Sequence, residues 1–284
     1  MEIFKNRMKL IRERVIIILL FSFFITSVIS QNNIDFLRIV KAYQDSVKLV
    51  APWQTPGVID TTTFNINTYL RIFDKLKLPP GLKCQYAYED NGTSGNPMLY
   101  VVKDSFDLEG YLNRGYREFI KQYNIDTTTF TPKTTKFLKR IHVLYGFAYQ
   151  NNAKKFIIPE DSKAGYLQYL YFNQLGEEFA LKWHSFAGQI SVIFSNDELK
   201  RLYNSYLKKT VRFSYDKEKF KELLNLYPSP IIEMGNNSCL ITWYEIIIQT
   251  GIYKRTYEIN RSAPYTVVKK EDIKILEIDA NFIY

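Results

Sequence analysis

The only two histidines of the 284-residue chain are His142 and His184, so any histidine-dependent triad or zinc site must use one of them. The sequence has no H-E-x-x-H, G-x-S-x-G, P-loop or G-x-G-x-x-G motif. His184 follows Trp183 on a predicted helix, and Glu177 lies two turns earlier on the same face, beyond direct contact. Together with Ser185 these side chains could flank a catalytic pocket. The alternative is that His184 is a helix-boundary histidine satisfied by ordinary hydrogen bonds.

Neither the other histidine nor the acidic turns strengthen the case for catalysis. His142 lies in a predicted strand and is a weaker candidate than His184. Glu89-Asp90-Asn91 and Glu160-Asp161 lie near predicted turns, but the alternating oxygen ligands and terminal Glu of a calcium loop are missing. We therefore predict no metal and no cofactor, and the sequence favours a protein without catalytic activity.

The two cysteines, Cys84 and Cys239, allow two interpretations. In an oxidising compartment they could form a disulfide, which would stabilise the fold by about 5 kcal/mol in the chain-entropy model. The alternative is a pair of buried thiols in separate strands. The sequence leaves both open.

The first 30 residues have the pattern of a signal peptide. Five basic residues precede residue 15, and residues 15–29 are apolar apart from Ser22, Thr26 and Ser27. This run is shorter than the roughly 20 residues of a membrane-spanning helix, and it ends in small residues before Gln31. We predict cleavage after Ser30, export to the periplasm or the medium, and no stable membrane span afterwards; an uncleaved anchor is the alternative.

The remaining chain is basic but has no concentrated basic tract. The net charge is +9 for the whole chain and +6 without residues 1–30, which hold five of the 38 basic and two of the 29 acidic residues. Pairs such as Lys139-Arg140 and Lys254-Arg255 are spread along the sequence, as on solvated surfaces. No nucleic-acid recognition motif is present, so a nucleic-acid partner is not expected. The aromatic content of 16% allows exposed rings that could stack on sugars.

An internal repeat is visible in the middle of the chain. The hexapeptide of residues 59–64 recurs unchanged at residues 125–130. Further matches follow in the same order: Tyr86–Asn91 with Phe147–Asn152, Lys103–Ser105 with Glu160–Ser162, Gly110–Asn113 with Gly165–Gln168, and Arg117–Phe119 with Glu177–Phe179. We interpret residues 59–124 and 125–188 as diverged duplicates; the alternative is chance reuse of capping turns in a chain of skewed composition.

Each unit is predicted to be a helix, a β-hairpin and a second helix. In the first unit an apolar stripe predicts a helix over residues 66–76, and residues 82–89 and 98–103 form a hairpin around Asn91-Gly92. A helix follows, with Leu112, Tyr116 and Phe119 on one face. The second unit ends in a helix whose stripe runs from Phe172 to Phe186, with Gly188 as its C-cap.

The flanking regions complete an α+β prediction. Residues 31–58 comprise an amphipathic N-terminal helix and a linker. Residues 189–284 begin with two helices, the first with a capping box at Ser195 and the second from about Asp216. The predicted strands of this region are residues 231–234, 239–249, 252–260, 265–269 and 273–282. Because they are separated by turn residues, we predict an antiparallel β-meander.

Two short segments carry a resemblance to known sequences. Leu82 to Val102 contains a Tyr-x-Tyr, an acidic-Gly turn and Pro97, and the second segment runs from Gly176-Glu177-Glu178-Phe179 to Trp183-His184. Both segments are similar to uncharacterised exported proteins of Bacteroidota type. The resemblance implies export and no particular activity.

The leading functional hypothesis is therefore an exported, non-catalytic binding protein whose partner is a glycan or protein of the cell envelope or the medium. An enzyme hydrolysing an envelope polymer, with its site near His184, is the first alternative. A structural subunit of an envelope complex is the second. The binding hypothesis expects aromatic and polar surface presented by the duplicated units, the enzyme hypothesis expects a cleft with a perturbed acid–base pair, and the structural hypothesis expects a large exposed apolar patch.

Overall fold

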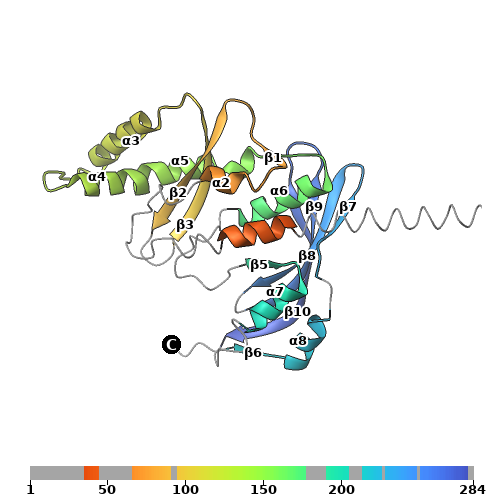
Figure 1. The fold of residues 1–284 in the computed structure, drawn as a ribbon. Coiled ribbons are helices and arrows are strands. Elements are labelled where there is room, and N and C mark those ends of the chain that lie inside the picture. Colours follow the sequence, from red (N-terminus) through yellow and green to blue (C-terminus); the bar gives the residue numbers. More distant parts are fainter. Residues whose placement is uncertain are drawn as a thin grey trace, which may run out of the picture.

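Helices and antiparallel strands occur in separate blocks along the chain (Figure 1). The computed structural model describes residues 35–44, 66–90, 95–176, 190–204, 213–225, 228–247 and 250–280. The predicted α+β class is confirmed, because the described residues form helices and strand pairs that are all antiparallel. The predicted signal peptide lies outside the described residues. Within the described residues no helix has the length and apolar character needed to cross a membrane.

The first unit begins differently from the prediction. Helix α2 (Ile66–Leu70) is a single short helix, whereas Phe73 lies between two turns and Leu76 begins the two-residue strand β1 (Leu76–Lys77). Of the apolar stripe, Phe73 is buried in the core, and Leu70 and Leu76 are half-buried against it. The backbone after α2, however, forms hydrogen bonds with a distant segment. The carbonyl of Lys75 accepts from the N–H of Glu160 at 2.8 Å, and β1 pairs with β4 (Ile158–Pro159).

The predicted hairpin and second helix of this unit are confirmed. Strands β2 (Leu82–Asp90) and β3 (Gly95–Lys103) pair from Leu82 opposite Lys103 to Asp90 opposite Gly95. The predicted turn at Asn91-Gly92 lies outside the described residues. Helix α3 (Leu108–Gln122) begins at Asp107, whose side chain accepts from the N–H of Gly110 at 2.8 Å.

The second unit is helical where a hairpin was predicted. Residues 132–150 form α4 (Pro132–Leu138), a π-helix (Lys139–Leu144) and α5 (Tyr145–Gln150). The prediction of a strand around His142 was therefore wrong. Thr131 caps this helical stretch by accepting from the N–H of Thr134, and Pro132 occupies its first turn, where proline favours a helix. The duplication itself remains a prediction from the sequence.

Helix α6 (Lys163–Leu175) lies at the centre of the molecule. Ser162 caps it by accepting from the N–H of Gly165 at 3.1 Å. It is buried on nearly every side, with Tyr166, Leu167, Leu170 and Phe172 almost fully enclosed. Figure 1 shows the helix of residues 35–44 running beside it. Phe172 and Leu175, the first residues of the stripe predicted to run to Phe186, belong to α6, and the predicted helix lies outside the described residues after Gly176.

The C-terminal region is a six-stranded antiparallel sheet in the order β5-β8-β9-β10-β6, with β7 also paired to β8. Its strands are β5 (Ile190–Ile193), β6 (Phe213–Tyr215), β7 (Ile231–Met234), β8 (Ser238–Ile247), β9 (Gly251–Asn260) and β10 (Val267–Ala280). The predicted meander is confirmed. The two strands predicted at residues 265–269 and 273–282 are one strand, β10, interrupted by two register shifts.

Two helices cover one end of this sheet. Helix α7 (Asn196–Leu202) begins at Ser195, which accepts from the N–H of Glu198, and α8 (Lys217–Leu223) begins at Asp216. Both caps are as predicted. The helices pack with Ile246, Ile252 and Leu276. The main core contains Cys239, Ile241, Trp243, Tyr257 and Ile259 of the other end of the sheet, together with α6 and residues 36–40. Because side chains alternate along a strand, the two cores use opposite faces of β8 and β9.

Candidate functional site

The residues that the sequence singled out for catalysis, Glu177, His184 and Ser185, lie outside the described residues. His142 is exposed on the π-helix, where its ring stacks on Phe119 at 4.1 Å between centroids. Among the described residues no three His, Cys, Asp or Glu side chains are grouped in a way that could hold a metal ion. In the part of the chain that the structure describes, no two of these candidate catalytic residues therefore contact each other.

The two cysteines are buried on separate strands and form no disulfide with each other. Cys84 lies on β2 and Cys239 on β8, and both belong to the main core. Burial raises the pKa of Cys239 to about 11. Since the thiolate is the reactive form of cysteine, this thiol is an inert core residue at neutral pH.

A cleft of about 580 Å³ lies between residues 35–39, α2 with the turn that follows it, and α6. This volume falls within the range of roughly 300–1,000 Å³ that is usual for small-molecule sites. The lining combines an apolar part with a polar rim: Phe36, Ile39, Ile72, Ala164 and Leu167 are apolar, and Asp35, Thr68, Arg71, Asp74, Lys75 and Gln168 are polar. The lining residues that the structure describes include no histidine, cysteine or serine.

Aromatic packing fixes the walls of this cleft. The ring of Phe73 contacts the rings of Phe36, Tyr69 and Phe172 edge to face, at 5.5, 5.1 and 5.3 Å between centroids. The hydroxyl of Tyr69 donates to the carbonyl of Gly176 at 2.9 Å. Helix 35–44, α2 and α6 are thus joined through one aromatic cluster beneath the cleft, so its shape is built into the core.

Gln168 holds the turn that forms the polar rim. Its side chain is buried within α6, where an uncharged polar group needs partners. The amide nitrogen Nε2 donates to Oδ1 of Asp74 at 2.8 Å, and Oε1 accepts from the N–H of Lys75 at 2.9 Å. Both hydrogen-bonding ends of the amide are used, so the turn is fastened to α6 and the side chains of its residues extend around the cleft.

The two basic residues of the rim, Lys75 and Arg71, differ in their ion pairs. Lys75 lies between two carboxylates, at 3.9 Å from Asp74 and 3.6 Å from Glu160. Arg71 donates to the hydroxyl of Thr68 at 3.1 Å and forms no ion pair with any residue in the described part of the chain. Its guanidinium is therefore the group at the rim best suited to receive an anion.

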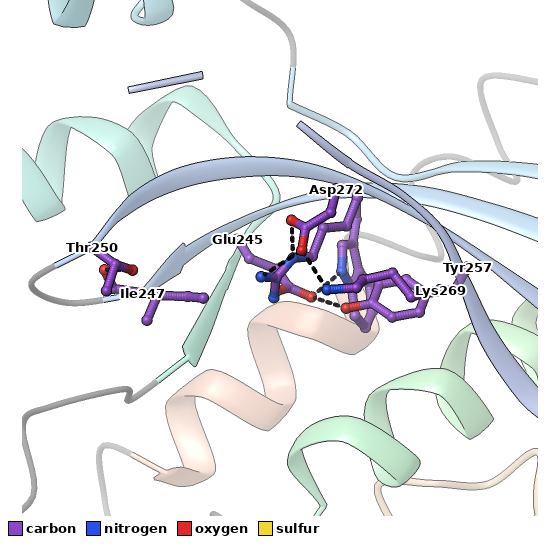
Figure 2. Close-up of polar contacts among 8 residues, drawn as sticks. Glu245, Ile247, Thr250, Tyr257, Lys269 and Asp272 are labelled. Carbon is purple, nitrogen blue, oxygen red and sulfur yellow. Dashed lines mark hydrogen bonds and ion pairs between the residues drawn. The ribbon is translucent and has the colours of Figure 1, made fainter. Parts of the chain in front are cut away.

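A second polar cluster lies on β8, β9 and β10 (Figure 2). The buried carboxylate of Glu245 accepts from the indole N–H of Trp243 at 2.6 Å, from the hydroxyl of Tyr257 at 3.0 Å and from Nη1 of Arg255 at 2.5 Å. Burial, followed by the charge of Glu245, raises the pKa of Tyr257. Three donors therefore satisfy the buried carboxylate of Glu245, which links β8 to β9.

Arg255 links this buried carboxylate to the surface. Nε donates to Oδ1 of Asp272 at 2.9 Å, and Asp272 also pairs with Lys269. Burial opposes the charge of Arg255, but the hydrogen bond to Asp272 and the charge of Glu245 outweigh it and raise the pKa. Hydrogen bonding to Arg255 lowers the pKa of Asp272. Figure 2 shows Glu245, Tyr257, Asp272 and Lys269 converging on this chain of contacts.

The cleft could not be found from the sequence, because its lining comes from three separate segments of the chain. Gln168 in α6 lies more than 90 residues after Asp74 and Lys75, to which it is hydrogen-bonded. The only local signal was the amphipathic spacing of residues 36–43, which indicated a buried face and not a site. Comparison of the chain with models of protein families, with curated proteins and with solved structures gives no match.

Proposed function

We propose that this chain is an exported binding protein without catalytic activity, and that its ligand binds in the cleft between residues 35–39, α2 and α6. The observation that carries the proposal is the combination of an apolar cleft with one arginine, Arg71, that has no carboxylate partner among the described residues. The side chains that line the cleft are positioned by core packing and by Gln168. A preformed site of this kind lowers the cost of binding.

The chemistry of the cleft indicates the class of ligand. Phe36, Ile39 and Leu167 would contact an apolar body, and Ile39 offers a side chain that is 55% exposed. Arg71 would receive a carboxylate, sulfate or phosphate group through its planar fork of donors. We therefore infer a ligand with an apolar body and one anionic group.

Isothermal titration calorimetry tests this proposal on the protein beginning at Gln31. Decanoate serves as the probe and decanol as its uncharged analogue. We expect decanoate to bind and to stabilise the protein by about 2.7 kcal/mol at 100 times its dissociation constant. Arg71→Gln should weaken decanoate at least tenfold, whereas Arg114→Gln, an exposed arginine on α3 outside the cleft lining, should not. Equal binding of decanoate and decanol would contradict the role of Arg71.

Export is the second part of the proposal and has its own experiment. The basic segment followed by the apolar run of residues 15–29 supports it. Expression of the whole chain in a bacterial host, followed by fractionation and mass spectrometry, should yield a protein outside the cytoplasm that begins at Gln31. A cytoplasmic product that retains residues 1–30 would exclude export by this segment.

A further inference from the structure

The carboxylate of Asp74, at the rim of the cleft, is held in one orientation. Gln168, which is only 4% exposed, donates from Nε2 to Oδ1 of Asp74 at 2.8 Å. The second oxygen, Oδ2, accepts no hydrogen bond from any residue that the structure describes, and it lies 3.9 Å from Nζ of Lys75, beyond hydrogen-bonding distance. Since the Asp74 side chain lines the cleft and is 63% exposed, it offers a ligand a preoriented acceptor.

The turn that carries Asp74 keeps one unit of negative charge. Nζ of Lys75 lies 3.9 Å from Asp74 and 3.6 Å from Glu160, so one cation serves two carboxylates. These three side chains are 37% to 63% exposed, and solvent weakens ion pairs at such positions. Asp35, the other carboxylate that the structure places in the lining, is paired with Arg38 at 3.5 Å. Residues 74, 75 and 160 together therefore leave a net charge of −1 beside the cleft.

Arg71 and Asp74 lie close together in the chain but form no ion pair with each other. They are three residues apart and both line the cleft, so their Cα atoms are separated by at most about 11 Å. The chain also turns within this stretch, because the N–H of Phe73 donates to the carbonyl of Leu70 at 3.0 Å. A positive and a negative group thus lie near one another on the same rim, and neither neutralises the other.

A ligand with an ammonium group next to its anionic group satisfies both charges. Ammonium groups donate strong hydrogen bonds to carboxylates, whereas a purely anionic ligand at Arg71 would place its charge near Asp74 without compensation. The apolar lining, which includes Phe36 and Leu167, accommodates a hydrocarbon chain on the same molecule. The charges and the apolar surface thus match the three parts of an amino acid.

We propose that the ligand of the cleft is an α-amino acid with a long apolar side chain. Its carboxylate binds Arg71, its ammonium group donates to Oδ2 of Asp74, and its side chain packs against Phe36 and Leu167. This inference rests on the proposed function and narrows it from an anionic amphiphile to a zwitterion. Gln168 is then a positioning residue, since it fixes the carboxylate that receives the ammonium group.

Isothermal titration calorimetry of the protein beginning at Gln31 compares three ligands with the same carbon chain. They are decanoate, each enantiomer of 2-aminodecanoate, and 10-aminodecanoate, whose ammonium group is at the opposite end from the carboxylate. One enantiomer of 2-aminodecanoate should bind about tenfold more tightly than decanoate, because it gains a charge-assisted hydrogen bond. 10-Aminodecanoate should bind more weakly than decanoate, because its ammonium group would lie against apolar side chains of the cleft.

Two matched variants identify the carboxylate. Asp74→Asn removes the charge but keeps an oxygen that accepts from Gln168, so decanoate and 2-aminodecanoate should then bind within about twofold of each other. Asp35→Asn removes the carboxylate of the same cleft that is already paired with Arg38, and the preference for 2-aminodecanoate should persist. Thermal melting of both variants verifies that the fold is retained.

The proposal is overturned if neither enantiomer of 2-aminodecanoate binds more tightly than decanoate, if 10-aminodecanoate binds as tightly as 2-aminodecanoate, or if Asp74→Asn keeps the preference. In each of these cases, decanoate binding that is weakened by Arg71→Gln would leave the proposed function intact. Failure of every ligand to bind would instead overturn the proposed function and this inference with it.

Discussion

Arg255 and Glu245 form an ion pair inside the sheet, with Nη1 donating to Oε2 at 2.5 Å and with side chains that are 10% and 1% exposed. Such a pair gains little over an apolar pair of the same shape, but removing one partner leaves an uncompensated charge in the interior. Asp272 gives Arg255 a second partner, whereas Glu245 has no other ion pair in the described part of the chain. The two halves of the pair should therefore respond differently to substitution.

Arg255→Met should lower the free energy of unfolding by about 3–5 kcal/mol, because it leaves the Glu245 carboxylate buried and unpaired. Glu245→Gln should cost less, since Arg255 keeps Asp272 and the amide still accepts from Trp243 and Tyr257. The double variant should recover part of the loss. Urea denaturation of the four proteins measures the coupling, and purely additive losses would contradict it.

Cys239 makes the fold sensitive to alkaline pH. Burial raises its pKa from 9.0 to about 11, so between these values the unfolded chain loses a proton that the folded chain keeps. Fewer protons on the unfolded chain mean that stability falls as pH rises, by about 2–3 kcal/mol between pH 9 and 11 for this group. Cys239→Ala should flatten this part of the profile in urea denaturation at several pH values. An unchanged slope would show that other groups, such as the buried tyrosines, account for it.

Replacing Gln168 with either an apolar or a charged side chain should destabilise the fold. Gln168→Leu removes two hydrogen bonds and should cost about 2–5 kcal/mol, because Asp74 and the N–H of Lys75 lose their partner. Gln168→Glu keeps the acceptor but faces the carboxylate of Asp74. Repulsion would raise the pKa of the new group, so this variant should recover stability as pH falls toward 4. Thermal melting at pH 4 and pH 7 compares the two, and a pH-independent loss would contradict the contact with Asp74.

Two glycines should respond to alanine with opposite signs. Gly251 has φ +141°, and a Cβ there would lie 2.1 Å from the carbonyl oxygen of Leu276 on the neighbouring strand. Gly251→Ala should therefore cost more than about 2 kcal/mol. Gly146 lies in α5 with open space around its Cβ position, so Gly146→Ala should stabilise by about 0.5–1 kcal/mol. Chemical denaturation of both variants checks the signs.

The sequence by itself determined the features that depend on neighbouring residues. Ser195 and Asp216 begin helices because their side chains accept from backbone N–H groups two or three residues ahead. The hairpin β2–β3 and the meander β7–β8–β9 follow from alternating apolar residues between turn residues. The α+β class results from the order of these local elements along the chain.

Tertiary contacts decided what local patterns could not. The helix predicted over residues 66–76 ends at Leu70, because Gln168 and Glu160 bind the backbone of Lys75. In β10 the register shift between Lys269 and Glu271 brings Lys269 and Asp272 onto one face, where they pair; in a regular strand residues three apart point to opposite faces.

The cleft and the contact between Phe119 and His142 also depend on tertiary structure. Arg71 reaches an apolar surface built by Phe36 and Leu167, and Phe119 meets His142 across two helices. Each site requires side chains from distant parts of the chain to be held at fixed positions, and only the packing of the core supplies that constraint. The residue types were visible in the sequence, whereas their proximity was a product of the fold.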